Sequence, residues 1–169
     1  GALFVVRTAG VNPDNGNRIY LNKAGQMVQY QHVVPTGTSR WKFMDGTTAP
    51  GIGSQDAVLY RPTQPKFYGG FDNNFRFKDF DFGFLLTFQG GNYVYNGTQA
   101  GLRDQRFWNN HTDVLRSWKK AGDETDIPLA IFTDNVSNGS AFPIDVNVEK
   151  GDFIKLRNMF IGYNIPKSI

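Results

Sequence analysis

The stretch KFYGGFDNNFRFKDFDFGFLLTFQGG, residues 66–91, decides the fold of this chain. Large apolar residues alternate with polar or small ones from Phe67 to Phe77, and again from Phe80 to Phe88. Alternation with a period of two predicts β-strands that have one apolar and one polar face. Lys78 and Asp79 lie between the two runs and are expected to form a two-residue hairpin loop. The stretch therefore predicts a long antiparallel hairpin.

Placing Phe77 opposite Phe80 fixes the register of the whole hairpin. Arg76 then faces Asp81 as a cross-strand pair of opposite charges. The expected apolar, lipid-facing side consists of Phe67, Phe71, Phe75, Phe77, Phe80, Phe82, Phe84, Leu86 and Phe88. The expected polar, lumen-facing side includes Tyr68, Asp72, Asn74, Arg76, Asp81, Thr87 and Gln89.

The length of the two runs separates two interpretations of this hairpin. Each run has about eleven residues, against ~5–6 in soluble sheets and ~9–11 in strands that cross a bilayer at a tilt. A transmembrane barrel would place the phenylalanines against lipid and the polar side against water. A soluble β-sandwich would instead use the phenylalanine face as its core. The pattern alone leaves both interpretations open.

A third strand is predicted from Asp152 to Pro166. Met159, Ile161 and Tyr163 share one face, but Ile154 and Leu156 are out of phase with them. A β-bulge near Arg157 would bring all of them to the same side. Short turns then fall at one end of the three strands and long excursions at the other, which is typical of outer-membrane barrels and favours that interpretation.

The remaining segments are expected to be loops that contain small elements. Residues 1–65 predict an outer loop region with a small β-meander rather than a core, with strands at 3–9, 18–21, 26–34 and around 41–43. Residues 92–151 predict a long extracellular loop with two short helices. The first helix is expected over 98–109 with Thr98 as N-cap, and the second over 113–121, begun by Thr112 and ended by Gly122.

Composition narrows the possible functions. The 169 residues include 15 Phe, 7 Tyr, 3 Trp and 19 Gly, which favours β-structure, and the formal net charge is only +3. The basic residues are dispersed, so the sequence does not indicate a nucleic-acid partner. There is no cysteine, which excludes disulfides and thiol nucleophiles. No run of 18 apolar residues predicts a transmembrane helix.

No catalytic or metal-binding constellation stands out in the sequence. His32 and His111 lack the helical spacing of a metal site, and the acids Asp123, Glu124 and Asp126 are close enough in sequence to be turn or capping groups. The segments 14–17 and 134–140 do not fit a calcium loop and are interpreted as turns. We therefore expect no cofactor, no metal and no enzymatic activity.

Four stretches resemble motifs of SusC/RagA-type TonB-dependent outer-membrane transporters. They are AGVNP at 9–13 with Gly16 and Asn17, PKFYGGF at 65–71, WKKAGDETDIP at 118–128 and GDFIKLRNMFIGYNIP at 151–166. They span nearly the whole chain in the order found in the family. Three positions depart from the family pattern, because Ala121 replaces proline, Asp152 replaces serine or threonine, and Phe160 replaces a small polar residue.

The resemblance implies an all-β fold: a segment from the C-terminal part of a large transmembrane antiparallel barrel of about 22 strands. The plug domain, the TonB-contacting segment and the last strands would lie outside this segment, and the chain begins without Met or a signal peptide, as an internal piece would. The remaining barrel strands and the lipid bilayer would be its neighbours. Residues 66–91 and 152–166 would be the transmembrane parts.

The implied function is import of a nutrient, an oligosaccharide or a peptide, across the bacterial outer membrane. TonB would supply the energy and a SusD-like surface lipoprotein would act as a lid. Trp108, Asn109 and Trp118 in the long loop are candidate substrate contacts, although packing within the loop is the simpler role. The alternatives are a secreted β-sandwich that binds glycans and, with least support, a glycan-cleaving enzyme. Both alternatives would be soluble, whereas a barrel segment would not.

Overall fold

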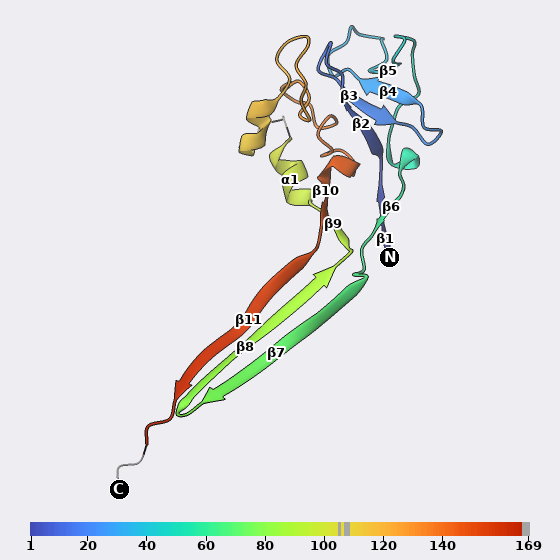
Figure 1. The fold of residues 1–169 in the computed structure, drawn as a ribbon. Helices are drawn as coiled ribbons and strands as arrows, with labels where there is room; N and C mark the ends of the chain where they lie inside the picture. The colour runs from blue at the N-terminus through green and yellow to red at the C-terminus, as the bar shows by residue number, and fades with distance from the viewer. Residues whose placement is uncertain (105, 107–108, 167–169) are drawn as a thin grey trace. The chain divides into compact units, whose positions relative to one another are not determined.

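A computed structural model describes residues 1–104, 106 and 109–166 (Figure 1). The chain forms two units, and each is described by itself. The strand unit comprises Gly1, residues 62–94 and the segment from Lys150 onward, and the loop unit comprises residues 2–61 and 95–149. Among the described residues, no helix is both long and apolar enough to cross a membrane.

Three long antiparallel strands form the sheet of the strand unit. They are β7 (Phe67–Phe77), β8 (Phe80–Gly90) and β11 (Phe153–Tyr163), each of 11 residues, in the order β11-β8-β7. Lys78 and Asp79 form the hairpin loop, and Lys78 has a positive φ of 54°. Phe77 pairs with Phe80 and Arg76 with Asp81. The predicted hairpin and its register are therefore confirmed.

Strand β11 pairs with β8 and contains the predicted bulge. Leu156 lies opposite Leu86, whereas Asn158 lies opposite Leu85, so Arg157 is the extra residue. Because the bulge shifts the phase by one, Ile154 and Leu156 before it share a face with Met159, Ile161 and Tyr163 after it. The strand itself is shorter than the 152–166 expected from the sequence.

The loop unit contains a meander of short strands. These are β2 (Arg7–Val11), β3 (Arg18–Leu21), β4 (Met27–Tyr30) and β5 (Trp41–Phe43), in the order β2-β3-β4-β5. The single strand expected over 3–9 is wrong, because β1 (Ala2–Val5) and β2 are separate strands. Val6 between them forms a parallel bridge with Ile144. Strand β4 is also shorter than the expected 26–34.

The expectation that the meander is not a core is wrong. Its buried residues form a hydrophobic cluster with residues from later segments: Val6, Tyr20, Val28, Tyr30, Ala49, Ile52 and Ile144. The rings of Tyr20 and Tyr30 lie 5.4 and 4.8 Å from that of Trp41. The buried Tyr20 hydroxyl donates to the carbonyl oxygen of Val136 at 2.7 Å. Distant segments thus complete a core that no single segment could form.

The other elements are short. Strand β6 (Val58–Pro62) pairs with β1, and β9 (Tyr93–Tyr95) with β10 (Val148–Lys150). The described residues also contain one α-helix and three short 3-10 helices. These are α1 (Gly97–Leu102), η1 (Ser54–Asp56), η2 (Thr112–Arg116) and η3 (Asp145–Asn147).

Both helix predictions need correction. Helix α1 begins earlier and ends at Leu102, and its N-cap is Asn96, whose side chain accepts from the Gln99 amide, rather than Thr98. The second segment is a 3-10 turn capped by His111 and ends at Arg116. Its continuation is prevented because the Trp118 amide donates to the Ile127 carbonyl at 3.0 Å, which holds the chain extended.

Candidate functional sites: a two-faced sheet and a loop groove

One face of the β11-β8-β7 sheet is apolar except for Asn73, which lies opposite Phe84. Phe71, Phe75, Phe82 and Phe84 lie with ring centroids 5.9–6.5 Å apart on this face, and Phe80 lies 4.8 Å from Tyr163 on β11. Side chains on this face are exposed: Phe67, Phe75 and Phe77 are 59%, 55% and 72% exposed. A continuous exposed surface of this kind marks an interaction with lipid or another apolar partner.

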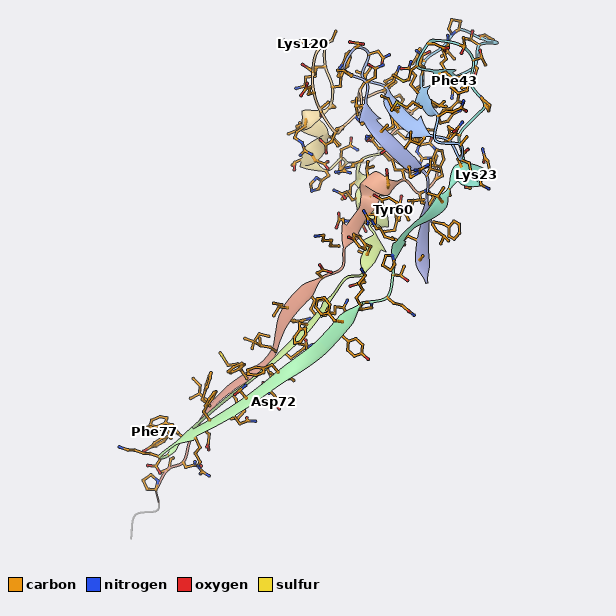
Figure 2. All side chains as sticks on the ribbon, turned by 45° about the vertical axis from the view of Figure 1, so that its right-hand side comes forward. Lys23, Phe43, Tyr60, Asp72, Phe77 and Lys120 are labelled. Carbon is orange, nitrogen blue, oxygen red and sulfur yellow. The ribbon has the colours of Figure 1, made fainter. Side chains whose placement is uncertain are left out.

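The opposite face is polar, and the paired registers arrange it in rows across the three strands. One row contains Asp72, Leu85 and Asn158, and another contains Arg76, Asp81 and Gly162. Asp72 and Phe77 are labelled on β7 in Figure 2. Arg76 Nε lies 3.3 Å from Asp81 Oδ1, so the predicted cross-strand ion pair is present. The Asp81 carboxylate also accepts a hydrogen bond from the side-chain Nδ2 of Asn164 at 3.0 Å.

The bulge residue also contributes to the polar face. Arg157 Nε donates to Thr87 Oγ1 at 3.2 Å. The guanidinium of the extra residue therefore lies on the polar face, beside Thr87. Another row of the polar face has Gly83 of β8 at its centre. Gly83 pairs with Phe160 of β11 on one side and with Asn74 of β7 on the other. The aromatic residue that departs from the family pattern therefore occupies space left by a glycine.

Two motifs behind the family resemblance contact each other in the loop unit. Trp118 Nε1 donates to the carbonyl oxygen of Pro13 at 2.8 Å, and the Gly122 amide donates to the same oxygen at 2.9 Å. Gly16 has a φ of +73°, and a Cβ atom there would lie 2.5 Å from Trp118 Cε3. The 118–128 segment thus packs on the 12–17 turn, and only glycine fits at position 16.

Arg18 on β3 links the meander to the segment 126–137 through hydrogen bonds. Its guanidinium is buried and donates to the carbonyl oxygens of Ser137 and Asp126, each at 2.9 Å. A buried cation is costly unless its hydrogen bonds are satisfied. The charge of Arg18 therefore holds residues 126–137 against β3.

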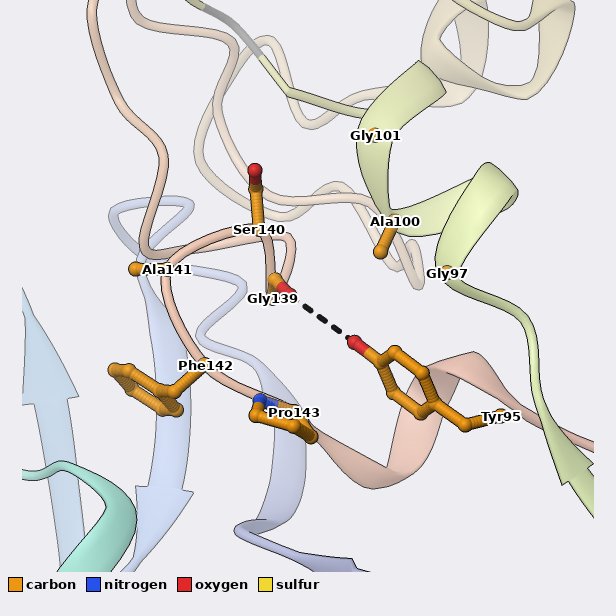
Figure 3. A pocket seen from close by; sticks show the side chains of 9 residues that line it. All are labelled: Tyr95, Gly97, Ala100, Gly101, Gly139, Ser140, Ala141, Phe142 and Pro143. Atoms are coloured by element: carbon orange, nitrogen blue, oxygen red, sulfur yellow. Dashed lines mark hydrogen bonds between the residues drawn. The ribbon is translucent and has the colours of Figure 1, made fainter.

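The loop unit contains an open groove beside helix α1. Two adjoining pockets of about 290 and 400 Å³ share Gly97, Gly101 and Ser140. Tyr95, Phe142 and Pro143 line one of them, and Asp104 and Arg106 line the other. Figure 3 shows the first pocket, with the Tyr95 hydroxyl directed to the Gly139 carbonyl oxygen, to which it donates at 3.1 Å. We call these two pockets together the α1 groove.

Ion pairs of two buried carboxylates support this groove. Asp104 accepts from Arg106 Nη2 and from the Ser140 hydroxyl, each at 2.6 Å. Arg103 Nε donates to Asp113 Oδ2 at 2.7 Å. Burial alone would raise the pKa of both carboxyl groups, but the hydrogen bonds from Arg106 and Ser140 to Asp104, and from Arg103 to Asp113, outweigh it and lower both pKa values. Both carboxylates are therefore charged near neutral pH.

The candidate substrate residues from the long loop do not form one site. Trp118 packs on Gly16, Asn109 is exposed, and Trp108 lies outside the described residues. Sequence reasoning missed the α1 groove, because residues 95–104, residue 106 and residues 139–143 come together only in the folded chain. The spacing of Gly97 and Gly101 on one helical turn was the available signal.

Asp123, Asp126 and both histidines, which were considered as catalytic or metal groups, have structural partners. Asp123 Oδ2 accepts from the Lys119 and Lys120 amides, and Asp126 pairs with Arg116. His32 Nε2 lies 2.9 Å from Thr133 Oγ1. Within the described ranges, no three His, Cys, Asp or Glu side chains are grouped so that they could hold a metal ion.

Comparisons with known proteins agree with this architecture. No protein-family model matches the sequence. The chain is 30% identical over 119 residues, 68% of its length, to the TonB-dependent receptor P26 of Formosa agariphila, and 25% identical over 118 residues to the TonB-dependent receptor P3 of the same organism. It spans only 11% of the length of each of these relatives.

Solved structures show the same fold. The structure of the RagAB peptide transporter superposes with a TM-score of 0.67 at 16% identity, covering 96% of this chain and 16% of that chain. The RagAB peptide importer in its "closed-closed" state gives a TM-score of 0.66 at 17% identity. At 16% and 17% identity, the similarity to the RagAB structures shows the fold alone.

The sheet and the comparisons together indicate a β-strand segment of an outer-membrane protein. More narrowly, the chain is similar to a segment of TonB-dependent receptors and has the fold of part of RagAB, so the resemblance to SusC/RagA-type transporters is confirmed. TonB-dependent receptors lie in the outer membrane, and the chain is assigned to that membrane. The matched relatives are receptors and transporters.

Proposed function

We propose that the chain is a wall-and-loop segment of a TonB-dependent transporter that imports an oligosaccharide or a peptide. The strand unit forms part of the barrel wall, with the phenylalanine face against lipid and the polar face toward the lumen. The loop unit lies outside the cell and contacts the substrate or a SusD-like lipoprotein lid. TonB acts through parts of the whole protein that this chain does not contain.

The observation that carries the proposal is the continuous apolar face of three paired strands of equal length. Each strand has 11 residues. At about 3.3 Å per residue and a tilt of about 40°, such a strand rises about 28 Å, close to the ~25 Å apolar band of outer-membrane barrels. The exposed phenylalanines would have no dry environment in water.

The soluble alternative, a glycan-binding β-sandwich, has less support. A sandwich needs a second sheet packed about 10 Å from the first. Within the described residues of the strand unit, β11-β8-β7 is the only sheet of long strands. Phe75 and Phe77 on its apolar face remain 55% and 72% exposed, which is unlike a sandwich core.

The wall assignment is tested on the full-length transporter in lipid vesicles. Spin labels are placed singly at residues 84 and 85, which are neighbours on opposite faces of β8. A lipid-soluble quencher should relax the label at position 84 more strongly, and a water-soluble quencher the label at position 85. Equal quenching at both positions by the lipid-soluble reagent would contradict the assignment.

The import function is tested in the source bacterium by deletion of the gene for the whole transporter. Loss of uptake of one oligosaccharide or peptide, with restoration by the intact gene, is the expected result. The lid is tested by purifying the tagged full-length protein and identifying a surface lipoprotein that copurifies. Unchanged uptake of every oligosaccharide and peptide supplied would contradict the import function.

A further inference from the structure

We propose that a pocket at one end of the apolar face binds a phospholipid whose headgroup carries both a phosphate and a primary ammonium group. The inference rests on the proposed wall function, because it needs the phenylalanine face to meet lipid. It goes beyond that function by naming one class of lipid and its site. Three observations carry it: a pocket with apolar walls, two charges of opposite sign beside it, and an acid at a position where the family pattern has a neutral residue.

The pocket lies at the end of the sheet that is remote from the Lys78-Asp79 loop, and we call it the rim pocket. Its volume is about 330 Å³, at the lower end of the ~300–1,000 Å³ that is usual for ligand sites. Its lining includes Phe67, Phe88, Gly90, Asp152 and Ile154. These residues all belong to the strand unit.

Glycines allow the aromatic walls of the rim pocket to lie against the sheet. Phe67 pairs with Gly90 and Phe88 with Gly69, and a Cβ atom at either glycine would collide with the ring of its partner. Each ring therefore covers a glycine of the neighbouring strand. Ile154 pairs with Phe88 from the other side and is 79% exposed. The space that these side chains border suits an acyl chain.

Two charged side chains lie beside Gly91, the residue that follows Gly90 of the lining. Asp152 Oδ1 accepts from the backbone amide of Gly91 at 2.8 Å. The stem of Lys66 packs against the same glycine, since a Cβ atom there would lie 2.8 Å from Cγ of Lys66. Both residues are exposed, and neither forms an ion pair with another described residue. A cation and an anion are therefore available to one ligand.

Asp152 supplies a charge that its bond to Gly91 does not require. Serine or threonine, which the family pattern has at this position, could accept from the same amide through a hydroxyl oxygen. Aspartate adds a second oxygen and a full negative charge. A carboxylate at the edge of a lipid-facing surface is costly unless it is paired. The charge of Asp152 therefore indicates a cationic group in the ligand.

A zwitterionic headgroup matches both charges. Its phosphate would pair with Lys66, as basic side chains at a membrane surface attract anionic lipid groups. Its ammonium group would donate a charge-assisted hydrogen bond to Asp152. A purely anionic lipid would satisfy Lys66 but would be repelled by Asp152, and a quaternary ammonium lipid has no N–H to donate. Phosphatidylethanolamine has both of the required groups.

The test uses the full-length transporter in mild detergent, with native mass spectrometry to measure which lipids it retains. The probes are phosphatidylethanolamine, phosphatidylcholine and phosphatidylglycerol with identical acyl chains, and monophosphoryl lipid A as an anionic glycolipid. Ile154→Trp fills the rim pocket. Ile161→Trp is its matched control, because Ile161 is 73% exposed on the same face of β11 but lies away from the pocket. Lys78→Gln is the control for Lys66→Gln, since it removes the same charge at the other end of β7.

The wild-type protein should retain phosphatidylethanolamine about 2- to 10-fold more strongly than the other probes, as one partly exposed charge-assisted hydrogen bond allows. Ile154→Trp should remove most of this retention, and Ile161→Trp should not. Asp152→Asn keeps the acceptor for the backbone amide but removes the charge, so the preference over phosphatidylglycerol should disappear. Lys66→Gln should weaken retention of both lipids, whereas Lys78→Gln should leave it unchanged.

Three results would overturn the inference: preferential retention of phosphatidylglycerol or lipid A by the wild type, equal retention of phosphatidylethanolamine by wild type and Ile154→Trp, or an unchanged preference in Asp152→Asn. The wall function is judged separately by the spin labels at positions 84 and 85. Lipid contact at position 84 without a preference for phosphatidylethanolamine would reject this inference alone. Equal quenching of the two labels would reject the wall function as well.

Discussion

Phe160 on β11 lies across Gly83 on β8, on the polar face of the sheet. A Cβ atom at Gly83 would lie 2.7 Å from Cζ of Phe160 and 2.5 Å from Oδ1 of Asn74. Gly83 is buried although its face is polar. An aromatic ring over a strand glycine stabilises the pairing and pins the register. This relationship gives Phe160, the departure from the family motif, a structural role.

Gly83→Ala is therefore expected to destabilise the full-length barrel by about 1–3 kcal/mol, the usual cost of overpacking. Urea unfolding, or the temperature at which the band shifts on an unheated SDS gel, measures the effect. Gly70→Ala is the control, because its Cβ would lie 3.5 Å from the nearest atom. Adding Phe160→Ala should recover part of the loss. A fully additive double mutant would show that the two residues are not coupled.

Phe84→Arg tests the membrane assignment energetically. Placed near mid-strand, the arginine should cost about 2–4 kcal/mol if residue 84 faces the bilayer midplane. Leu85→Arg is the matched control, since residue 85 belongs to the polar face and should tolerate the charge with less than half that cost. Unfolding in vesicles of defined lipid measures both. Similar costs at the two positions would argue against lipid on the phenylalanine side.

The Arg76–Asp81 pair is expected to contribute little energy. The two side chains are 68% and 35% exposed, so solvent screens their attraction. A double-mutant cycle with Arg76→Ala and Asp81→Ala should give a coupling of about 0–1 kcal/mol, decreasing with salt. A coupling above that range would indicate that the pair is dry in the whole barrel.

The hairpin was predictable because its determinants are local. Phe77, the loop Lys78-Asp79 and Phe80 fix the register, and period-two alternation then assigns every side chain to a face. The bulge at Arg157 was predictable for the same reason, since Ile154 and Met159 can share a face only if one residue is extra.

The loop unit was not predictable in this way, because its structure depends on distant partners. Val6 is held by Ile144, and Arg18 by Ser137, each more than a hundred residues away in the sequence. Thr98 resembles an N-cap in the sequence, but Asn96 supplies the capping oxygen, which accepts from the backbone amide of Gln99. The α1 groove depends on the same long-range contacts.

Gly16→Ala should loosen the docking of the 118–128 segment. Its positive φ costs an alanine about 1–2 kcal/mol, and the clash with Trp118 adds about 1–3 kcal/mol. Gly25→Ala separates the two terms, because Gly25 has a φ of +82° and open space around its Cβ position. Protease added to intact cells should cut within 118–128 faster in Gly16→Ala than in Gly25→Ala. Equal rates would exclude a specific Trp118 contact.

Acid should loosen the α1 groove through Asp104. Hydrogen bonds from Arg106 and Ser140 lower its pKa below the ordinary value of 3.8, against the opposing effect of burial. A carboxyl group with a lowered folded-state pKa stabilises the fold above its unfolded pKa, and this contribution is lost as the pH falls through the folded value. Stability should thus be level from pH 7 to 5 and decrease below about pH 4.

Pepsin cleavage of residues 95–116 in the full-length protein should accelerate between pH 4 and 2. Asp104→Asn should remove the part of this acceleration that Asp104 contributes, and an identical pH profile in wild type and Asp104→Asn would show that other carboxyl groups, such as Asp113, control it.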